Sequence, residues 1–484
     1  MLFMGIDVGS SGCKASVIDE EGKLICFSTR EYSFTYENGN SELDADVVWE
    51  SVFSAICELG NSADLSELKT ISVTSFGEMF VLLDENYNVL RTSISYEDLR
   101  GSEELEEIEE LDKIYSITGA VPDAMYALLK LLWIKKNQPE IFEKAKYMCM
   151  FADFILLRLG AVHHTDYSLA ARTLMFDVKN KCWADEIFNM LQLDKSICGR
   201  LVPSGTDVGK ISDAVAKAAK LSPKVKLLSG GHDQPCAALG AGIIKPGIAL
   251  DGMGSNECIV PAFSSPMINE TMKASNLVCV PHIVPQLYVT YAFNRTAGSL
   301  FKWYNNLTGN EGYETLTEIM PEKPTDLLVL PHFAGAATPY MDNESVGAVL
   351  GLKTSTTKGE LAKGIIEGMN YEMLINLKCL EKAGFKVEML YASGGLSKSD
   401  KILQIKADIL GIPVTRLKNS ETGTVGTAIL GGIAMGIYKD FDSAIATVVR
   451  TDKVFVPDME KHKLYMNQFK KYEKLYLAVK GVIK

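Results

Sequence analysis

The chain has 484 residues, of which 47% are hydrophobic and 23% charged, and its formal net charge is −12. The length predicts two domains or more, and the composition is typical of a globular protein. The acidic balance argues against a nucleic-acid partner or an anionic membrane surface, since such partners bind basic faces. No uninterrupted apolar stretch reaches the ~20 residues that a membrane span needs.

Ten cysteines are scattered along the chain without a CxxC pair, so the usual thiolate zinc spacings are missing. Scattered cysteines are typical of a reducing compartment. The first residues, MLFMGIDVGSSG, lack the basic segment of a signal peptide and enter a strand at once. We therefore expect a cytoplasmic protein.

Apolar runs alternate with helical patterns throughout, which predicts an α/β fold. The first turns are rich in glycine and predict an antiparallel meander of strands over residues 2–7, 13–19 and 23–34. An amphipathic helix over 44–60, a strand over 68–76 and a hairpin over 79–90 are predicted to follow.

Three further helices are predicted over residues 102–114, 123–137 and 151–160. In the first, Leu105, Ile108 and Leu111 form one apolar stripe, and the many acidic residues form a solvated face. Near the end of the chain, aromatic residues at helical spacing predict a helix that docks on the protein: Tyr465, Phe469, Tyr472 and Tyr476.

Residues 247–262 resemble residues 4–19, since each has an apolar strand, an aspartate, a turn of glycine and serine, and a second strand. This loose repeat predicts two related halves, 1–244 and 245–484, that face each other across a ligand cleft. A chance similarity is the alternative.

The turn after Asp7 contains Gly9, Ser10, Ser11 and then Lys14. Small residues let backbone N–H groups converge on an anion, the lysine adds a cation, and the aspartate at the strand end suits a metal ion. An ordinary hairpin turn has the same composition. Neither a GxxxxGK[ST] nor a GxGxxG motif occurs.

The segment LLSGGHDQPCAALGAG, residues 227–242, ends an apolar strand in two glycines and then presents Asp233 and Gln234 before a small-residue helix. Ligands of open α/β sheets bind at such strand ends. A second strand ends in Gly394 and Gly395, and a helix begins near Ser399, a corner that brings backbone close to an anionic or flat group. Glu78, Tyr96, Asp98 and Arg100 fall near strand ends and suit a polyhydroxylated ligand, with a surface ion pair as the alternative for Asp98 and Arg100.

Taken together, these stretches resemble the FGGY carbohydrate kinases, a family that shares its domain plan with actin, hexokinase and the chaperone ATPases. The matching stretches occur in order over most of the chain: GIDVGSSGCK, ISYEDLRG, HTDYSLAARTLMFDVKNKCWADEI, SGGHDQPCAALGAG, ASGGLSKSD and ETGTVGTAILGG. The resemblance implies two actin-like, ribonuclease H-like domains that flank a nucleotide and sugar cleft, and an ATP-dependent kinase of a small sugar or polyol.

The resemblance also implies the roles of particular residues. Asp233 is implied as the general base, and Asp7 as the residue that positions Mg²⁺. The implied substrate contacts are Gly77, Glu78, Tyr96, Asp98, Arg100, Asp233 and Gln234. The implied ATP contacts are Gly9, Ser10, Ser11, Lys14, Gly254, Ser255, Asn256, Gly298, Gly394, Gly395 and Ser397.

The motifs leave the sugar open. A ketopentose, as in xylulose kinases, is the favoured substrate, and glycerol, a tetrulose and rhamnulose are the alternatives. Gly77-Glu78 is half of the glycerol-kinase Arg-Glu pattern, and Gly254-Ser255-Asn256 replaces the usual Gly-Thr-Ser. His232, beside the base, is an unusual neighbour within reach of the sugar. An actin-like or chaperone-like ATPase, or a sugar-binding regulator, is the alternative class, and a homodimer stays open.

Overall fold

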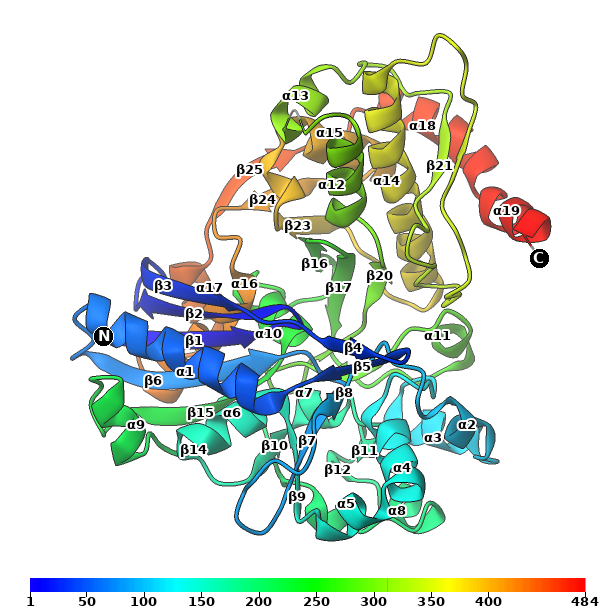
Figure 1. The fold of residues 1–484 in the computed structure, drawn as a ribbon. Coiled ribbons are helices and arrows are strands. Elements are labelled where there is room, and N and C mark those ends of the chain that lie inside the picture. The colour runs from blue at the N-terminus through cyan, green and yellow to red at the C-terminus, as the bar shows by residue number, and fades with distance from the viewer. Residues whose placement is uncertain (311, 484) are drawn as a thin grey trace.

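The computed structural model describes residues 1–310 and 312–483 and contains two large sheets, one below and one above the middle of Figure 1, besides several small ones. The first sheet has the order β14-β15-β6-β1-β2-β3. Its strands are β14 (Asp207–Lys210), β15 (Lys226–His232), β6 (Leu68–Ser75), β1 (Leu2–Val8), β2 (Gly12–Asp19) and β3 (Leu24–Glu31). The second sheet contains β17 (Glu257–Phe263), β16 (Ile248–Met253), β23 (Met389–Ser393), β24 (Val414–Leu417) and β25 (Thr451–Phe455), with β19 (Tyr288–Val289) and β20 (Ala292–Asn294) beside β17.

The two sheets repeat one topology. In each, the first strand pairs antiparallel with the next strand of a hairpin and parallel with a strand that arrives later in the chain. A further parallel strand and then an antiparallel edge strand follow in both sheets. The matching hairpins β1–β2 and β16–β17 are the two segments whose sequences resemble each other.

Two helices lie between the sheets, α10 (Asp233–Gly240) and α16 (Thr422–Ala434), and they pack on each other (Figure 1). Their contact is close because a Cβ at Gly240 would overlap the carbonyl oxygen of Thr422, and one at Gly426 that of Cys236. α16 also packs on β1 and β6, so this late segment of the chain covers the first sheet.

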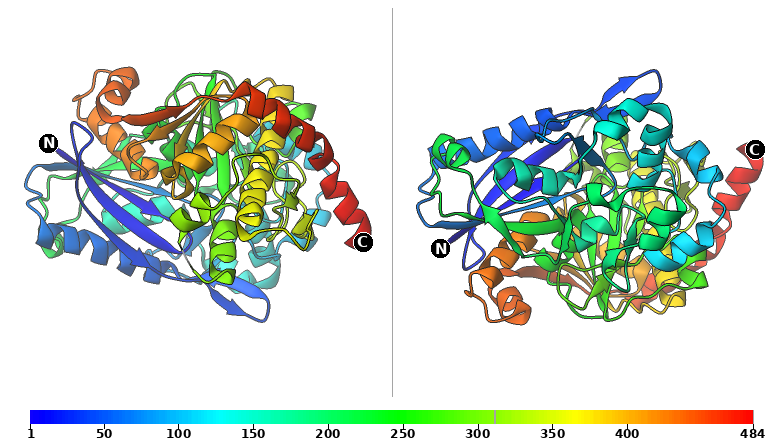
Figure 2. Two further views of the ribbon diagram at one scale, coloured as in Figure 1. Left: turned by 90° about the horizontal axis from the view of Figure 1, so that it is seen from above. Right: turned by 90° about the horizontal axis from the view of Figure 1, so that it is seen from below.

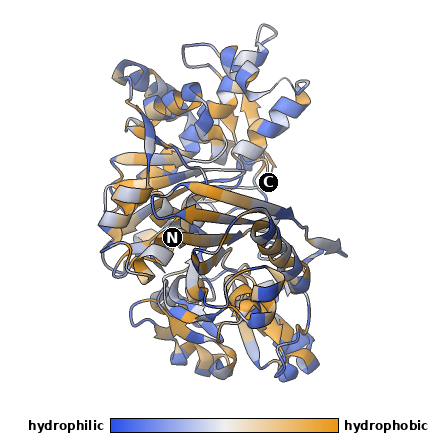
Figure 3. Ribbon diagram, turned by 90° about the vertical axis from the view of Figure 1, so that its left-hand side faces the viewer, coloured by the Kyte–Doolittle hydropathy of each residue, from blue (hydrophilic) through white to orange (hydrophobic). Residues whose placement is uncertain are grey.

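Outer helices complete the layers. α1 (Ala45–Ser62) and α6 (Phe151–Leu159) cover the other face of the first sheet, and Asp44 caps α1 by accepting hydrogen bonds from the N–H groups of Asp46 and Val47. α14 (Lys358–Lys382), α15 (Asp400–Leu410) and α18 (Met459–Tyr472) pack on one another beside the second sheet. Figure 3 shows the strands in the middle of the molecule as mainly hydrophobic, and Figure 2 shows the two chain ends at opposite sides.

Most predicted elements are confirmed, and one is wrong. Residues 102–114 form two helices, α2 (Ser102–Glu106) and α3 (Leu111–Thr118), because carboxylates that accumulate toward a helix C-terminus oppose the helix dipole. Residues 79–90 form a short hairpin, in which an antiparallel bridge joins Leu83 to Val89 and the N–H of Leu90 donates to the carbonyl of Leu82; β7 (Phe80–Leu83) pairs on its other side with β9 (Tyr147–Met150). The predicted docking of the C-terminal aromatic residues is confirmed, since Tyr465, Phe469, Tyr472 and Tyr476 are buried.

Candidate active site

Asp233 is the first residue of α10, directly after β15, as the sequence predicts. Its side chain is 34% exposed, but Oδ1 is buried and has no hydrogen-bond partner among the described residues. Burial raises the pKa of this carboxyl to about 8, and the negative charges of Asp7 and Glu78 act in the same direction. Asp233 is therefore a carboxylate that lies at the end of a strand and binds a proton more strongly than an ordinary aspartate does.

A buried ion pair lies beside the aspartate. Arg172 donates from Nε to Oε1 of Glu78 at 2.7 Å, and its Nη2 contacts the same oxygen. Burial acts to raise the pKa of Glu78, but the Arg172 guanidinium holds it below its ordinary value. The arginine stem needs the space at Gly77, where a Cβ would lie 2.5 Å from Cγ of Arg172 and 2.7 Å from Cδ2 of His232.

Aromatic side chains enclose this ion pair. The Arg172 guanidinium lies 5.0 Å from the ring centre of Tyr126 and 5.5 Å from that of Tyr291. Burial raises the pKa of Tyr96 to about 12, and the tyrosine lies close enough to Asp233 and Glu78 for their charges to act on it. Flat rings and a few fixed polar groups make a typical site for a small polar ligand.

The first hairpin loop brings Asp7 toward the same place. Asp7 faces Lys14 across the β1–β2 pair, and Lys14 forms an ion pair of 2.7 Å with Glu421 rather than standing free. Burial raises the pKa of Asp7 to about 6, and Glu421 adds to the rise. At the turn the N–H of Gly9 donates to the carbonyl of Gly12, which leaves Ser10 and Ser11 at the tip.

A cavity of about 560 Å³ lies in the second half, next to the β16–β17 turn. Four predicted ATP contacts line it: Gly254, Ser255, Gly298 and Gly395. Trp303, Asn306 and Tyr313 form further walls, mostly from α12 (Gly298–Leu307). The cavity therefore combines backbone-rich turns, a helix N-terminus and aromatic faces, which suits a nucleotide.

The turn after β23 shapes this cavity. Gly394 has φ +98°, and a Cβ there would lie 2.5 Å from the carbonyl oxygen of Met253, so the position requires glycine. Ser397 donates from Oγ to the Gly394 carbonyl at 2.7 Å and fixes the turn. Asn256 lies at the exposed tip of the β16–β17 turn and is not among the residues that line the cavity.

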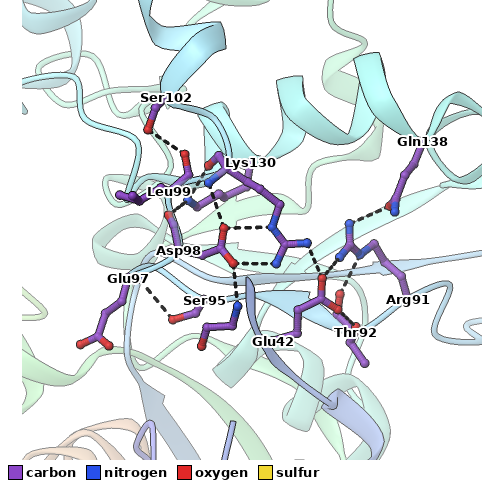
Figure 4. A network of polar contacts seen from close by, with 12 residues as sticks. Glu42, Arg91, Thr92, Ser95, Glu97, Asp98, Leu99, Ser102, Lys130 and Gln138 are labelled. Atoms are coloured by element: carbon purple, nitrogen blue, oxygen red, sulfur yellow. Dashed lines mark hydrogen bonds and ion pairs between the residues drawn. The ribbon is translucent and has the colours of Figure 1, made fainter. Parts of the chain in front are cut away.

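Asp98 and Arg100 lie in an internal network, shown in Figure 4. The Asp98 carboxylate accepts from the N–H of Ser41 and from the guanidinium of Arg100, which also reaches Glu42. Lys130, which is buried, donates to the carbonyl oxygens of Asp98 and Arg100. These contacts fix the loop that carries Tyr96, and they join Asp98 and Arg100 as a largely buried ion pair.

Sequence reasoning missed several side chains of the site. Arg172 lies inside the segment HTDYSLAARTLMFDVKNKCWADEI, but no local pattern shows that its guanidinium reaches Glu78. Tyr291 comes from the other half of the chain, and nothing in its sequence neighbours signals the contact. Gln234, at the start of α10, is half-buried and follows Asp233.

The described residues contain no group of three or more histidine, cysteine, aspartate or glutamate side chains that could hold a metal ion among themselves. None of the described helices is long and apolar enough to cross a bilayer.

Known proteins resemble this chain over its whole length. The sequence models of the FGGY family of carbohydrate kinases match residues 2–240 with the N-terminal domain and 253–435 with the C-terminal domain. A xylulose kinase of Staphylococcus epidermidis is 29% identical over 99% of this chain and 97% of its own length. A glycerol kinase of Streptococcus pyogenes is 28% identical over 100% and 96%.

Among solved structures, a gluconate kinase from Lactobacillus acidophilus superposes with a TM-score of 0.90 at 23% identity, over 99% of this chain and 98% of that one. The likeness confirms the predicted two-domain actin-like fold. The chain belongs to the FGGY family of carbohydrate kinases and is a phosphotransferase that uses ATP as a substrate.

Proposed function

We propose that this kinase transfers the γ-phosphoryl group of ATP to a hydroxyl of a small neutral sugar, a ketopentose, with Asp233 as the general base. The single observation that carries the proposal is the position of Asp233: a carboxylate with a raised pKa at a strand end, next to the Glu78–Arg172 pair and to Asp7. Phosphoryl transfer needs positioning and charge stabilisation more than covalent catalysis, and this site offers both.

Asp233 accepts the proton of the sugar hydroxyl while that oxygen bonds to the γ-phosphorus and the bond to the ADP oxygen breaks. A base is most effective when its pKa lies near the working pH, and burial brings the pKa of Asp233 to about 8. Closure of the two halves around the substrates excludes water and limits ATP hydrolysis.

Asp7 fits a magnesium ion. Carboxylate oxygen is a preferred ligand of Mg²⁺, and the raised pKa of Asp7 indicates a negative charge that its protein neighbours do not fully compensate. Mg²⁺ neutralises charge on the transferred phosphoryl group when it is bound. We place the triphosphate between the two hairpin turns, with Ser10 and Ser11 on one side and Gly254 and Ser255 on the other, and the adenosine in the 560 Å³ cavity.

The charges of the site favour a neutral sugar over a sugar acid. The site has three carboxylates, Asp7, Glu78 and Asp233, and its two cations are already engaged: the Arg172 guanidinium by Glu78, and Lys14 by Glu421. A substrate carboxylate would therefore enter a negative environment, which disfavours an aldonate such as the gluconate named for the structural neighbour. The relatives named xylulose kinase and glycerol kinase act on neutral substrates, and the former supports a ketopentose.

We place the reaction in the cytoplasm, because ATP is available there and all ten cysteines, each of them within the described part of the chain, are free thiols.

The test is ADP release by the purified protein with ATP and Mg²⁺ against xylulose and other ketopentoses, rhamnulose, a tetrulose, glycerol, gluconate and a blank without sugar. We expect a large rise with a ketopentose and none with gluconate. Activity with glycerol, rhamnulose or the tetrulose alone would support the kinase reaction but show that the substrate is not a ketopentose. ADP release that is equal in every tube would overturn sugar phosphorylation in favour of an ATPase.

A further inference from the structure

His232 lies between two polar groups that come from different halves of the chain. Its Nδ1 is 3.0 Å from Oη of Tyr291, and its Nε2 is 3.2 Å from Oδ1 of Asp233. Both rings are buried, the imidazole at 5% exposure and the phenol at 7%. Tyr291 belongs to the segment between β19 and β20 of the second sheet, whereas His232 ends β15 of the first.

The hydrogen-bonding needs of these groups allow one arrangement when Asp233 is ionised. Oδ1 of Asp233 is buried and accepts no hydrogen bond as the side chains stand, and His232 Nε2 lies 3.2 Å from it, so a small rotation of the imidazole or the carboxylate brings this nitrogen into hydrogen-bond geometry. A buried carboxylate oxygen needs a donor, so the imidazole proton belongs on Nε2. Nδ1 is then an acceptor, and the Tyr291 hydroxyl donates to it.

The surroundings keep His232 neutral and in place. Burial lowers the pKa of His232 to about 3, although the Glu78 charge opposes the shift and Arg172 adds to it. The backbone N–H of His232 donates to Oγ of Ser168 at 2.8 Å, and Ser168 in turn contacts Asp166. A neutral imidazole carries a single ring proton, so the position of that proton is a defined property of the site.

We propose that His232 is a positioning residue for the base: its Nε2–H holds Oδ1 of Asp233, which leaves Oδ2 for the sugar hydroxyl, and Tyr291 fixes the tautomer. The inference rests on the proposed role of Asp233 as the base. Because Tyr291 comes from the second half, the base is correctly oriented only when the two halves are together. Tyr291 also lies over Arg172, so one ring contacts the base-holding histidine and the arginine of the sugar site.

The first test is the ring-nitrogen NMR spectrum of the whole ¹⁵N-histidine-labelled protein at pH 9, where Asp233 is ionised. The chain has six histidines, and a His232→Gln variant assigns the signal. His282 is an internal reference for the Nε2–H tautomer, because its Nδ1 accepts from the N–H of Val284 and its Nε2 faces the Ile243 carbonyl. His164 is the opposite reference, because its Nδ1 is 2.8 Å from the Val162 carbonyl.

We expect the Nε2–H tautomer for His232, with Nδ1 shifted as an acceptor, and a mixture of tautomers in Tyr291→Phe. An Nδ1–H tautomer in the wild-type protein at pH 9 would overturn the proposal. This measurement needs no activity, so it stays informative if Asp233 is not the base.

The second test separates the donor from mere packing. His232→Gln keeps an amide donor near the position of Nε2, and His232→Leu removes it. We expect kcat to fall roughly 100-fold in His232→Leu and at most about tenfold in His232→Gln, with the KM for ATP unchanged. The acid limb of the pH profile of kcat/KM for the sugar moves upward in His232→Leu, since the carboxylate loses a donor while Asp7, Glu78 and Arg172 stay.

His282→Leu is the matched control, since it removes a buried neutral imidazole outside the site; it lowers the unfolding temperature and leaves the acid limb in place. Equal kcat values and acid limbs for His232→Leu and His232→Gln would refute the positioning role. If Asp233→Asn keeps wild-type turnover, the proposed base itself is wrong, and that result is distinct from a failure of His232 alone.

Discussion

The two matching hairpins of the molecule carry an aspartate at the same position and surround it differently. Asp7 on β1 is half-buried, and its pKa is raised to about 6 because burial and Glu421 outweigh Lys14. Asp251 on β16 is completely buried at 2.7 Å from Lys406, which also contacts Glu257. Lys406 and the two carboxylates therefore form a buried cluster, in which burial raises the pKa of Glu257 against the opposing charge of Lys406.

The difference shows that two hairpins of the same topology can use the same aspartate in different ways. The first hairpin leaves the carboxylate of Asp7 half-buried near Asp233, whereas the second uses its carboxylate to attach β16 and β17 to α15, the helix of Lys406. On the proposed roles, we expect activity to depend on Asp7 and stability on Asp251.

The largest expected effects come from removing the charge of Asp7 or of Lys406. Asp7→Asn should lower kcat at least 100-fold and weaken Mg²⁺ dependence without loss of fold, because it removes the proposed metal ligand. Lys406→Met should cost about 3–5 kcal/mol of unfolding free energy, because it leaves two buried carboxylates without their cation. Mg²⁺ titration of the reaction rate measures the first effect, and urea unfolding measures the second. Wild-type stability of Lys406→Met would contradict the stabilising role of the Asp251 cluster.

Two glycines test the sugar and nucleotide sides separately. Gly77→Ala places a Cβ against Arg172 and should raise the KM for the sugar at least tenfold, whereas Gly394→Ala crowds the Met253 carbonyl and should raise the KM for ATP. Steady-state kinetics with each substrate varied gives both constants. Gly436→Ala is the control for strain alone, since Gly436 has φ +70° and open space around it. A rise in the same constant for both site variants would contradict the division between the halves.

The pH dependence of stability tests the raised pKa of Asp233. Its pKa in the folded protein is about 8, above the ordinary value of 3.8, so the folded state holds a proton that the unfolded state has lost. Stability contributed by this group is therefore lost as the pH rises from about 4 through about 8. We expect Asp233→Asn to unfold at the wild-type temperature near pH 4 and a few degrees higher at pH 9. An equal difference at both pH values would contradict the raised pKa.

The smallest effect is expected at Lys14. Its ion pair with Glu421 is partly exposed, and such pairs contribute at most about 1 kcal/mol. Because the ammonium group is engaged there, Lys14→Met should change the KM for ATP less than about threefold. A rise of more than about thirtyfold would instead assign Lys14 to the phosphates, as the sequence motif predicts.

Local sequence patterns were enough for much of the fold. The strands of the first meander, the amphipathic helix over 44–60 and the glycine turn before Asp233 are local features, and the structure has them where they are predicted. The prediction of one helix over 102–114 was wrong, because it rested on the apolar stripe and took no account of the carboxylates near Glu106, where α2 ends.

The site was harder to predict because its chemistry depends on long-range contacts. Asp98 and Arg100 have the residue types of a sugar site, yet partners far away in the sequence, Ser41 and Glu42, engage them. Arg172 and Tyr291 show the reverse case, since neither has a motif of its own and each reaches the site through the packing of distant segments.

The most direct test of the account is the turnover of Asp233→Asn with the best sugar of the panel, together with the binding of that sugar and of ATP. We predict that both ligands bind with affinities close to those of the wild-type protein while phosphorylation falls at least 1,000-fold, on the order of what removing a general base costs. Wild-type turnover by this variant would contradict the assignment of the base and, with it, the interpretation of the cleft.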